Sequence, residues 1–192
     1  PRDKAFIILY SGFLNSINGI DFLISAFQDI IKKSDIKLKL IIAGRGPLQQ
    51  YVENISKVNP SIQYIGLIRY EDMPILYNAC DLFVIPRPAV KDAEEFYPIK
   101  LIEAMAMEKP VLVSDVKAMT EIVTDNSTGF IFNKGSFESF AQKLITTLNL
   151  KESLPGIGKA ARKHVLEKYG WEHSRMLLSH KYQELLSGIK SK

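Results

Sequence analysis

Short runs of consecutive apolar residues alternate along this chain with longer segments whose apolar residues recur every three or four positions. Phe6-Ile-Ile-Leu-Tyr10 is a run of the first kind, and such runs are typical of strands buried on both faces of a parallel sheet. Segment 19–32 is of the second kind, because one face of the helix that it predicts carries Ile20, Leu23, Ile24, Phe27 and Ile31. The pattern therefore predicts strands and amphipathic helices in alternation.

Over the whole chain this alternation predicts six strands, at 6–10, 38–43, 62–65, 82–86, 111–114 and 129–132. The predicted helices cover 19–32, 47–57, 71–80, a central segment with Pro98 in its first turn, 118–123, 136–148, 154–169 and 171–188. Strands that alternate with helices favour an α/β fold: a doubly wound, Rossmann-like parallel sheet of about six strands with helices on both faces. Ligands bind beyond the carboxyl ends of the strands in such sheets.

The central segment, Glu95-Phe-Tyr-Pro-Ile-Lys-Leu-Ile-Glu103, carries the most chemistry. It opens as a loop and continues as a helix whose polar face presents Lys100 and Glu103. A helix N-terminus attracts anions, and a carboxylate can accept hydrogen bonds from sugar hydroxyls. A phosphorylated sugar would match this segment. The alternative is structural: Glu95 is an acidic residue at a helix start, and Lys100 and Glu103 form a solvated ion pair.

The two glutamates and the Ala104-Met-Ala-Met-Glu-Lys-Pro110 that follows resemble the signature of retaining glycosyltransferases of family 4, which have the two-domain B-type fold. The resemblance extends upstream to Ile41-Ile-Ala-Gly-Arg-Gly-Pro47 and downstream to Glu121–Phe130, and it covers roughly Phe6 to Leu186. In that family the first glutamate contacts the donor sugar and the second the ribose. These positions are Glu95 and Glu103 here.

The resemblance implies that this chain is the C-terminal, donor-binding half of such an enzyme, and a start at Pro1 rather than Met fits a piece of a longer protein. Residues 1–170 would bind a nucleotide-diphosphate sugar, and the helix within 171–192 would pack on an N-terminal domain that holds a saccharide or lipid-linked acceptor. The expected reaction is glycosyl transfer with retention, in bacterial surface polysaccharide synthesis. This fragment alone would be inactive.

The same resemblance assigns roles to residues. Glu95 and Lys100 are the expected catalytic pair: Glu95 positions the sugar, and Lys100 stabilises the leaving diphosphate together with a helix N-terminus near Phe96. The other expected donor-binding residues are Gly12, Arg45, Leu67, Ile68, Phe96, Tyr97, Ile99 and Glu103. Among these, Arg45 assists at the diphosphate, and Leu67 and Ile68 form an apolar wall for the base. The family needs no metal and no other cofactor.

One departure from the family pattern lies in the loop after the first strand. The family places an Arg soon after Gly12 and a Lys before Gly19, and both grip the diphosphate; here these positions are Phe13 and Asn18. Other groups must therefore supply the charge, or the domain binds its donor weakly. Arg87, which follows the fourth strand, is either a contact to the donor or acceptor or a plain surface residue.

Composition narrows the remaining classes. A net charge of +4 suits anionic ligands but is too small to indicate nucleic acid. The single cysteine, Cys80, excludes an internal disulfide framework and favours a reducing, cytoplasmic location. The three histidines have no other metal-binding residues at ligand spacing beside them. No apolar run is long enough to span a membrane. The basic residues of the last two helices are either a solvated face or a peripheral contact with an anionic membrane surface. Two other functions stay open: a B-type nucleotide-sugar epimerase and a non-catalytic nucleotide-binding or interaction module.

Overall fold

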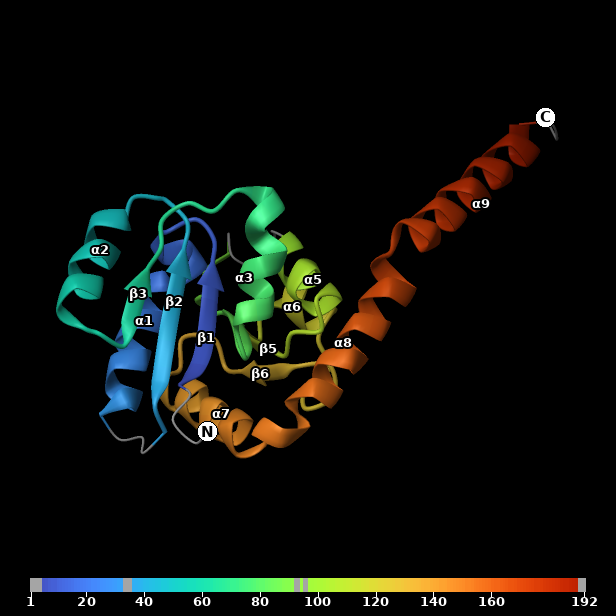
Figure 1. Ribbon diagram of the computed structural model, residues 1–192. Coiled ribbons are helices and arrows are strands. Elements are labelled where there is room, and N and C mark those ends of the chain that lie inside the picture. Colours follow the sequence, from blue (N-terminus) through green and yellow to red (C-terminus); the bar gives the residue numbers. More distant parts are fainter. Residues whose placement is uncertain (1–4, 33–35, 92–93, 95–96, 190–192) are drawn as a thin grey trace.

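The computed structural model describes residues 5–32, 36–91, 94 and 97–189. They form one all-parallel sheet with strand order β3-β2-β1-β4-β5-β6 (Figure 1). The strands are β1 (Phe6–Ser11), β2 (Leu38–Ala43), β3 (Ile62–Tyr64), β4 (Leu82–Ile85), β5 (Val111–Ser114) and β6 (Phe130–Phe132). The predicted α/β class, the parallel pairing and the number of strands are confirmed.

The helices also follow the predicted order. They are α1 (Ile20–Ile31), α2 (Gln49–Val58), α3 (Met73–Ala79), α5 (Ile99–Ala106), α6 (Lys117–Thr120), α7 (Phe137–Asn149), α8 (Leu154–Tyr169) and α9 (Trp171–Ile189), with short 3₁₀ turns at Ser16–Asn18, Tyr70–Asp72 and Lys151–Ser153. The prediction of a helix over 118–123 is only partly right, because α6 ends at Thr120.

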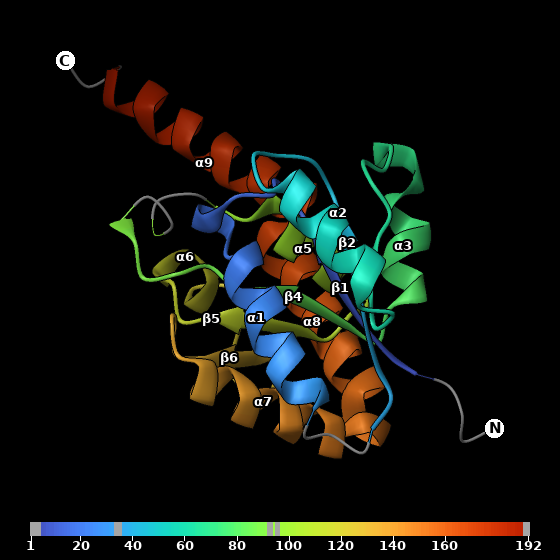
Figure 2. The same cartoon turned by 90° about the vertical axis from the view of Figure 1, so that its left-hand side faces the viewer.

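Helices cover both faces of the sheet and bury a separate apolar core on each. One core joins the inward side chains of α1, α2 and α7 to one face of the strands, and Figure 2 looks onto this layer. The other core joins α3, α5, α6 and α8 to the opposite face. All four side chains of β4 and of β5 are buried, as expected of strands covered on both sides. The doubly wound arrangement is therefore confirmed.

The order of the strands creates a switch point between β1 and β4. From β1 the chain winds outward through β2 and β3, then returns to the other side of β1 and winds outward through β4, β5 and β6. The connections therefore leave β1 and β4 in opposite directions, and a crevice opens between their carboxyl ends.

The last helix, α9, projects away from the sheet (Figure 1). Its apolar side chains are exposed: Trp171 is 91% exposed, and Met176, Leu177, Leu178, Tyr182, Leu185 and Leu186 are each more than half exposed. Such a stripe on a single helix is typical of a surface that packs on something else. The prediction that segment 171–192 packs on another domain is untested and stays a prediction.

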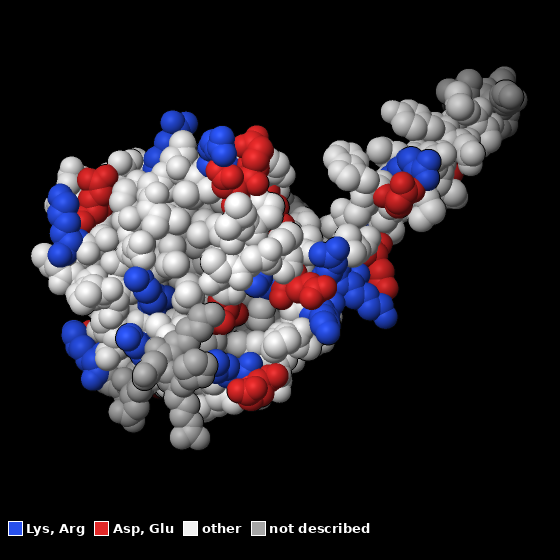
Figure 3. All heavy atoms as spheres, viewed as in Figure 1, with Lys and Arg blue, Asp and Glu red and all other residues white. Residues whose placement is uncertain are grey.

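Charged residues of both signs are interspersed over the face drawn in Figure 3. Several basic residues of the last two helices pair with nearby carboxylates, as in Arg175–Glu172 at 2.6 Å and Lys181–Glu184 at 2.8 Å. Exposed pairs of this kind contribute little to stability, and they fit a solvated face. Within the described ranges, no helix is both long and apolar enough to cross a membrane.

Candidate functional site: a two-lobed cleft at the switch point

A cleft with two lobes lies at the carboxyl ends of the central strands. The first lobe, about 220 Å³, opens between the ends of β1 and β4 and the start of α5. The second lobe, about 270 Å³, opens between the ends of β1 and β2 and the segment after β3. Ser11, Gly12, Phe13 and Lys100 line both lobes. The two lobes are therefore neighbouring parts of one cleft that meet at Lys100 and the Gly12 loop.

Backbone hydrogen bonds tie together the three glycines that follow β1, β2 and β3. The Gly12 N–H donates to Ala43 O at 3.0 Å, and the Gly44 N–H donates to Gly66 O at 2.8 Å. Gly44 has φ of +138°, and a Cβ at this position would lie 1.8 Å from the carbonyl oxygen of Gly12. Only glycine therefore fits where the two loops touch. The contact holds the Gly12 loop at the junction of the lobes.

The Gly12 loop offers no cation to the cleft. Asn18 Nδ2 and Tyr10 Oη each donate to the carbonyl oxygen of Phe13 at 3.1 Å, so the amide of Asn18 closes the loop on itself. The Phe13 ring is half exposed. Burial raises the pKa of the Tyr10 phenol well above its usual range, so Tyr10 stays protonated and remains a donor. Hydrogen bonds from Tyr10 and Asn18 thus shape this loop, and neither Phe13 nor Asn18 carries the charge that the family pattern has at these two positions.

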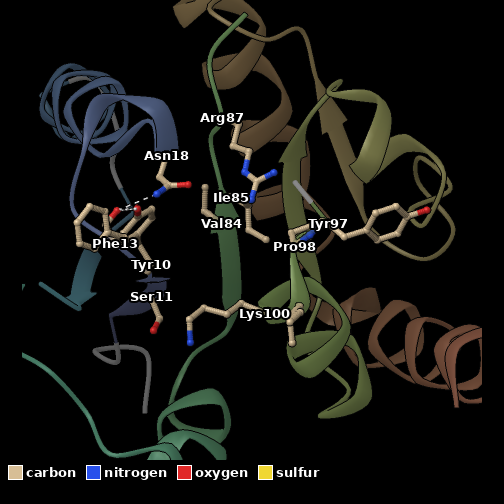
Figure 4. A pocket seen from close by; sticks show the side chains of 12 residues that line it. Tyr10, Ser11, Phe13, Asn18, Val84, Ile85, Arg87, Tyr97, Pro98 and Lys100 are labelled. Atoms are coloured by element: carbon tan, nitrogen blue, oxygen red, sulfur yellow. Dashed lines mark hydrogen bonds between the residues drawn. The ribbon is translucent and has the colours of Figure 1, made fainter. Parts of the chain in front are cut away.

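Two cations line the first lobe from the other side. Lys100, one residue into α5, extends across the cavity toward Ser11 (Figure 4) and forms no ion pair with any described carboxylate. Arg87 follows β4 and is only 9% exposed, and its side chain lies at the wall of the lobe. Burial lowers the pKa of Arg87, yet a guanidinium remains charged at neutral pH. The alternative in which Lys100 pairs with Glu103 is not realised.

Glu103 lies one turn further along α5 and faces α3. Its Oε2 accepts a hydrogen bond from Tyr77 Oη at 2.9 Å. Burial, followed by the nearby Glu103 carboxylate, raises the pKa of Tyr77 above its usual range, so the phenol keeps the proton that it donates. Glu103 is not among the described residues that line either lobe. Tyr77 therefore fixes the orientation of this carboxylate, which lies on the same helix as Lys100 but outside the lining of the cleft.

The predicted base-binding residues lie together in the second lobe. Leu67 is 65% exposed at its rim, Ile68 is partly buried against the core beneath, and Arg45 lines the lobe from the turn after β2. The exposed Tyr70 ring and the buried Met73 complete this apolar wall. A mostly apolar pocket of this kind suits a nucleotide base. The structure thus brings Gly12, Arg45, Leu67, Ile68 and Lys100 to one cleft, as predicted.

The opening of α5 differs from the prediction. Glu95 and Phe96 lie outside the described residues, so their predicted roles stay predictions. Tyr97 and Ile99 do line the first lobe. However, α5 begins at Ile99, not near Phe96, and Pro98 precedes the helix with ψ of 87° instead of lying in its first turn. Proline disfavours helical backbone at the residue before it, and that residue, Tyr97, donates its Oη to Glu121 Oε2 at 2.8 Å.

These features can be compared with known proteins. A family model described as "Glycosyl transferases group 1" matches residues 1–164. The chain belongs to this family. Among its curated relatives is the capsular polysaccharide biosynthesis glycosyltransferase CapM of Staphylococcus aureus, 31% identical over 176 residues, which are 87% of this chain and 44% of CapM. The chain spans less than half the length of the first curated relatives that it matches.

Two solved structures share the fold of this chain. Sucrose-phosphate synthase from Thermosynechococcus elongatus superposes with a TM-score of 0.80 at 23% identity, over 98% of this chain and 47% of that one. Anabaena HepE, solved in complex with UDP-glucose, superposes with a TM-score of 0.74 at 21% identity, over 92% of this chain and 49% of that one. The fold is that of the C-terminal domain of B-type glycosyltransferases.

Sequence reasoning missed one residue that supports the site of this group 1 domain, Glu94. Its carboxylate accepts the Lys117 N–H at 2.8 Å and pairs with Lys134 Nζ. The pKa of Glu94 is lowered, first by the hydrogen bond from Lys134 and then by that from Lys117. Glu94 therefore links its own position in the chain to the start of α6 and to the segment after β6. Two consecutive glutamates were the available signal, but sequence spacing cannot say which of the two is structural.

The remaining reactive residues lie away from the cleft. Cys80 caps α3, is 5% exposed, and burial raises the pKa of its thiol to about 12. This fits the predicted core role rather than that of a nucleophile. Among the described residues, no group of three or more His, Cys, Asp and Glu side chains could hold a metal ion.

Proposed function

We propose that this chain is the donor-binding domain of a retaining glycosyltransferase and holds a nucleotide-diphosphate sugar across the two lobes of the cleft. The observation that carries the proposal is the position of Lys100, whose side chain lines both lobes where they meet at the switch point between β1 and β4. A cation at a junction between an apolar slot and a more polar pocket suits the diphosphate that joins a nucleoside to a sugar.

In this proposal each lobe binds a different part of the donor. The base lies in the second lobe against Leu67 and Ile68, and Arg45 reaches the phosphates from its rim. The ribose lies toward α5, where Glu103, oriented by Tyr77, accepts its hydroxyls. The sugar lies in the first lobe beside Tyr97 and Ile99, with Glu95 as the predicted contact to its hydroxyls. HepE, whose fold this chain shares, was solved with UDP-glucose, which makes UDP-sugars the first donors to test.

The chemistry required of such a site is departure of a nucleotide diphosphate. Negative charge develops on the diphosphate oxygens as the bond to the sugar breaks, and fixed positive charge beside those oxygens stabilises the transition state. Lys100 supplies that charge here, together with the backbone N–H groups at the start of α5. In this proposal no metal is needed, since side-chain cations take its place.

The proposed acceptor and pathway rest on the names of relatives rather than on this cleft. CapM is named for capsular polysaccharide biosynthesis, which supports a role in bacterial surface polysaccharide synthesis, with a saccharide or lipid-linked acceptor. The acceptor would be held by a second domain that packs on the exposed stripe of α9. A cytoplasmic location and contact with the membrane surface remain predictions.

The proposal is tested by NMR titration of the ¹⁵N-labelled chain with UDP-glucose. We expect shifts of the amides of Gly12, Gly44 and Lys100, because these groups surround the junction of the lobes. A separate groove of about 580 Å³ lies between α1 and α7. Shifts confined to that groove, or no shifts at millimolar donor, would contradict the proposal. Analysis of the sugar nucleotide after incubation separates the epimerase, which returns an isomeric nucleotide sugar without any acceptor, from the transferase, which does not.

A further inference from the structure

We propose that Arg87 is the second cation of the diphosphate site and supplies the charge that the Gly12 loop lacks. This inference rests on the proposed donor binding and names a residue that the family pattern does not assign. In this arrangement the positive charge has moved across the cleft, from the loop after β1 to the residue after β4.

The position of Arg87 supports this assignment. It comes two residues after β4 ends at Ile85, so it lies at the switch point, where the crevice opens. Its side chain is nine-tenths buried and lines the first lobe. Figure 4 shows Arg87 and Asn18 pointing into the cavity from opposite walls, with Lys100 crossing the cavity below them. A surface arginine would instead extend into solvent, as Arg69 does with 79% of its side chain exposed.

The opposite wall explains why the charge is needed there. Phe13 and Asn18 line the same lobe as Arg87, but neither carries charge. Asn18 is committed to the loop, since its side chain donates to Phe13 O and its backbone N–H donates to Asn15 Oδ1 at 2.9 Å. The Gly12 loop can therefore approach a phosphate with its backbone, but it cannot neutralise one. Among the described residues, Arg87 and Lys100 are the two cations that line the lobe it faces.

The chemistry of the two cations is complementary. A guanidinium is planar and can donate two parallel hydrogen bonds to one phosphate, whereas an ammonium acts as a point charge on a flexible stem. Arg87 is held at the cavity wall by burial, so it loses little conformational freedom when a phosphate binds. Lys100 lies at the junction of the lobes and can move between the two phosphates. Together they would hold the diphosphate without help from the Gly12 loop.

The test compares ligands that differ only in phosphate. Uridine, UMP and UDP are titrated by calorimetry into the chain and into Arg87→Gln. The substitution should weaken UDP binding by about 10- to 100-fold, the range expected for a charged hydrogen-bond pair, and should leave uridine binding unchanged. Arg175→Gln on α9, where the arginine pairs with Glu172, is the control and should bind UDP like the unsubstituted chain.

A second variant tests whether a cation on the Gly12 loop can replace Arg87. Asn18→Lys places an amine on the wall opposite Arg87, so Asn18→Lys in the Arg87→Gln background should regain at least several-fold in UDP affinity. If Arg87→Gln does not fold, Arg87→Lys keeps the charge but loses the paired donors, and it should bind UDP more weakly than the unsubstituted chain.

Each remaining outcome has a separate meaning. Equal loss of uridine and UDP binding in Arg87→Gln, or loss only for a UDP-sugar that bears a carboxylate, would overturn the role of Arg87 at the diphosphate. Unchanged UDP binding in that variant would overturn it too, while leaving the proposed donor site intact. Failure of the unsubstituted chain to bind UDP, GDP and ADP would overturn both.

Discussion

The phenolic oxygen of Tyr77 on α3 donates to the carboxylate of Glu103 on α5 across 2.9 Å. This hydrogen bond joins two helices of the same core, and it gives one carboxylate oxygen a permanent donor. Glu103 is partly exposed, and in the proposed donor complex its carboxylate also accepts the ribose hydroxyls. A carboxylate held in this way is oriented before a nucleotide arrives, so less ordering is needed on binding.

Replacement of Tyr77 by Phe should therefore weaken nucleotide binding. The substitution removes one hydrogen bond to a charged group, and such a bond is worth about 1.5–3 kcal/mol. Only part of that free energy should be lost from binding, because the bond is present before the nucleotide arrives. We therefore expect UDP affinity to fall by about 5- to 20-fold. Glu103→Ala should lower it further, and the double substitution should add little, because the two side chains act as one unit. Tyr51→Phe on α2, where the ring is 37% exposed, is the control. Full additivity in calorimetric titrations would contradict this account.

Gly44 should tolerate no side chain. Its φ of +138° disfavours any L-residue, and an added Cβ would meet the Gly12 carbonyl oxygen at 1.8 Å. We expect Gly44→Ala to lower the free energy of unfolding by more than about 3 kcal/mol in urea denaturation. The control is Gly156→Ala, since Gly156 lies in α8 with nothing within 4 Å of an added Cβ. That control should be neutral or slightly stabilising, and equal effects of the two substitutions would be incompatible with the loop contact described.

The ion pair between Glu94 and Lys134 should make stability depend on pH in a defined direction. The folded-state pKa of Glu94 is lowered, so its contribution is complete above the pKa of the unfolded chain and is lost as the pH falls through the folded-state value. The pKa of Lys134 is raised, so its contribution is present in neutral solution and disappears only in strong base.

Glu94→Gln should therefore have a lower melting temperature than the unsubstituted chain at pH 7, and the difference should shrink toward zero below about pH 4. Thermal melts followed by circular dichroism across this range measure the difference. Glu152→Gln removes an exposed glutamate and serves as the control for loss of charge alone. A difference that persists unchanged in acid would mean that Glu94 acts through packing and not through its charge.

The Cys80 thiol should be inert in the folded chain. Burial raises its pKa to about 12, so at pH 8 its thiolate fraction is roughly three orders of magnitude below that of an ordinary cysteine. Ellman's reagent should label the native chain very slowly and the urea-unfolded chain at once. Rapid labelling of the native chain would show that the segment between α3 and β4 opens easily.

The fold followed from short-range patterns. Phe6–Tyr10 is apolar throughout, and Leu38–Ala43 is apolar except for Lys39. Such short, nearly continuous apolar runs differ from the amphipathic helices between them. The rule that ligands bind beyond the carboxyl ends of parallel strands then predicts that Gly12 and Arg45 lie at one edge of the sheet. These predictions succeeded because they depend on periodicity and on strand direction, which are local properties.

The contacts that orient the site could not be predicted in this way. Tyr77 and Glu103 are 26 residues apart, and Glu94 and Lys134 are 40 residues apart. Each pair meets only because two loops or helices pack side by side in three dimensions. The start of α5 was also misplaced: Pro98 suits a first helical turn locally, but α5 begins at Ile99, and Tyr97 just before Pro98 is bonded to the distant Glu121.

The central claim is that this domain holds a nucleotide diphosphate at the junction of the two lobes, beside Lys100 and Glu103. Calorimetric titration of the chain with UDP, GDP and ADP, repeated on Glu103→Ala and Lys100→Ala, tests it most directly. We expect one nucleotide to bind best, and both substitutions to weaken that binding at least about tenfold. Absence of binding by all three nucleotides, or binding that neither substitution changes, would contradict the claim.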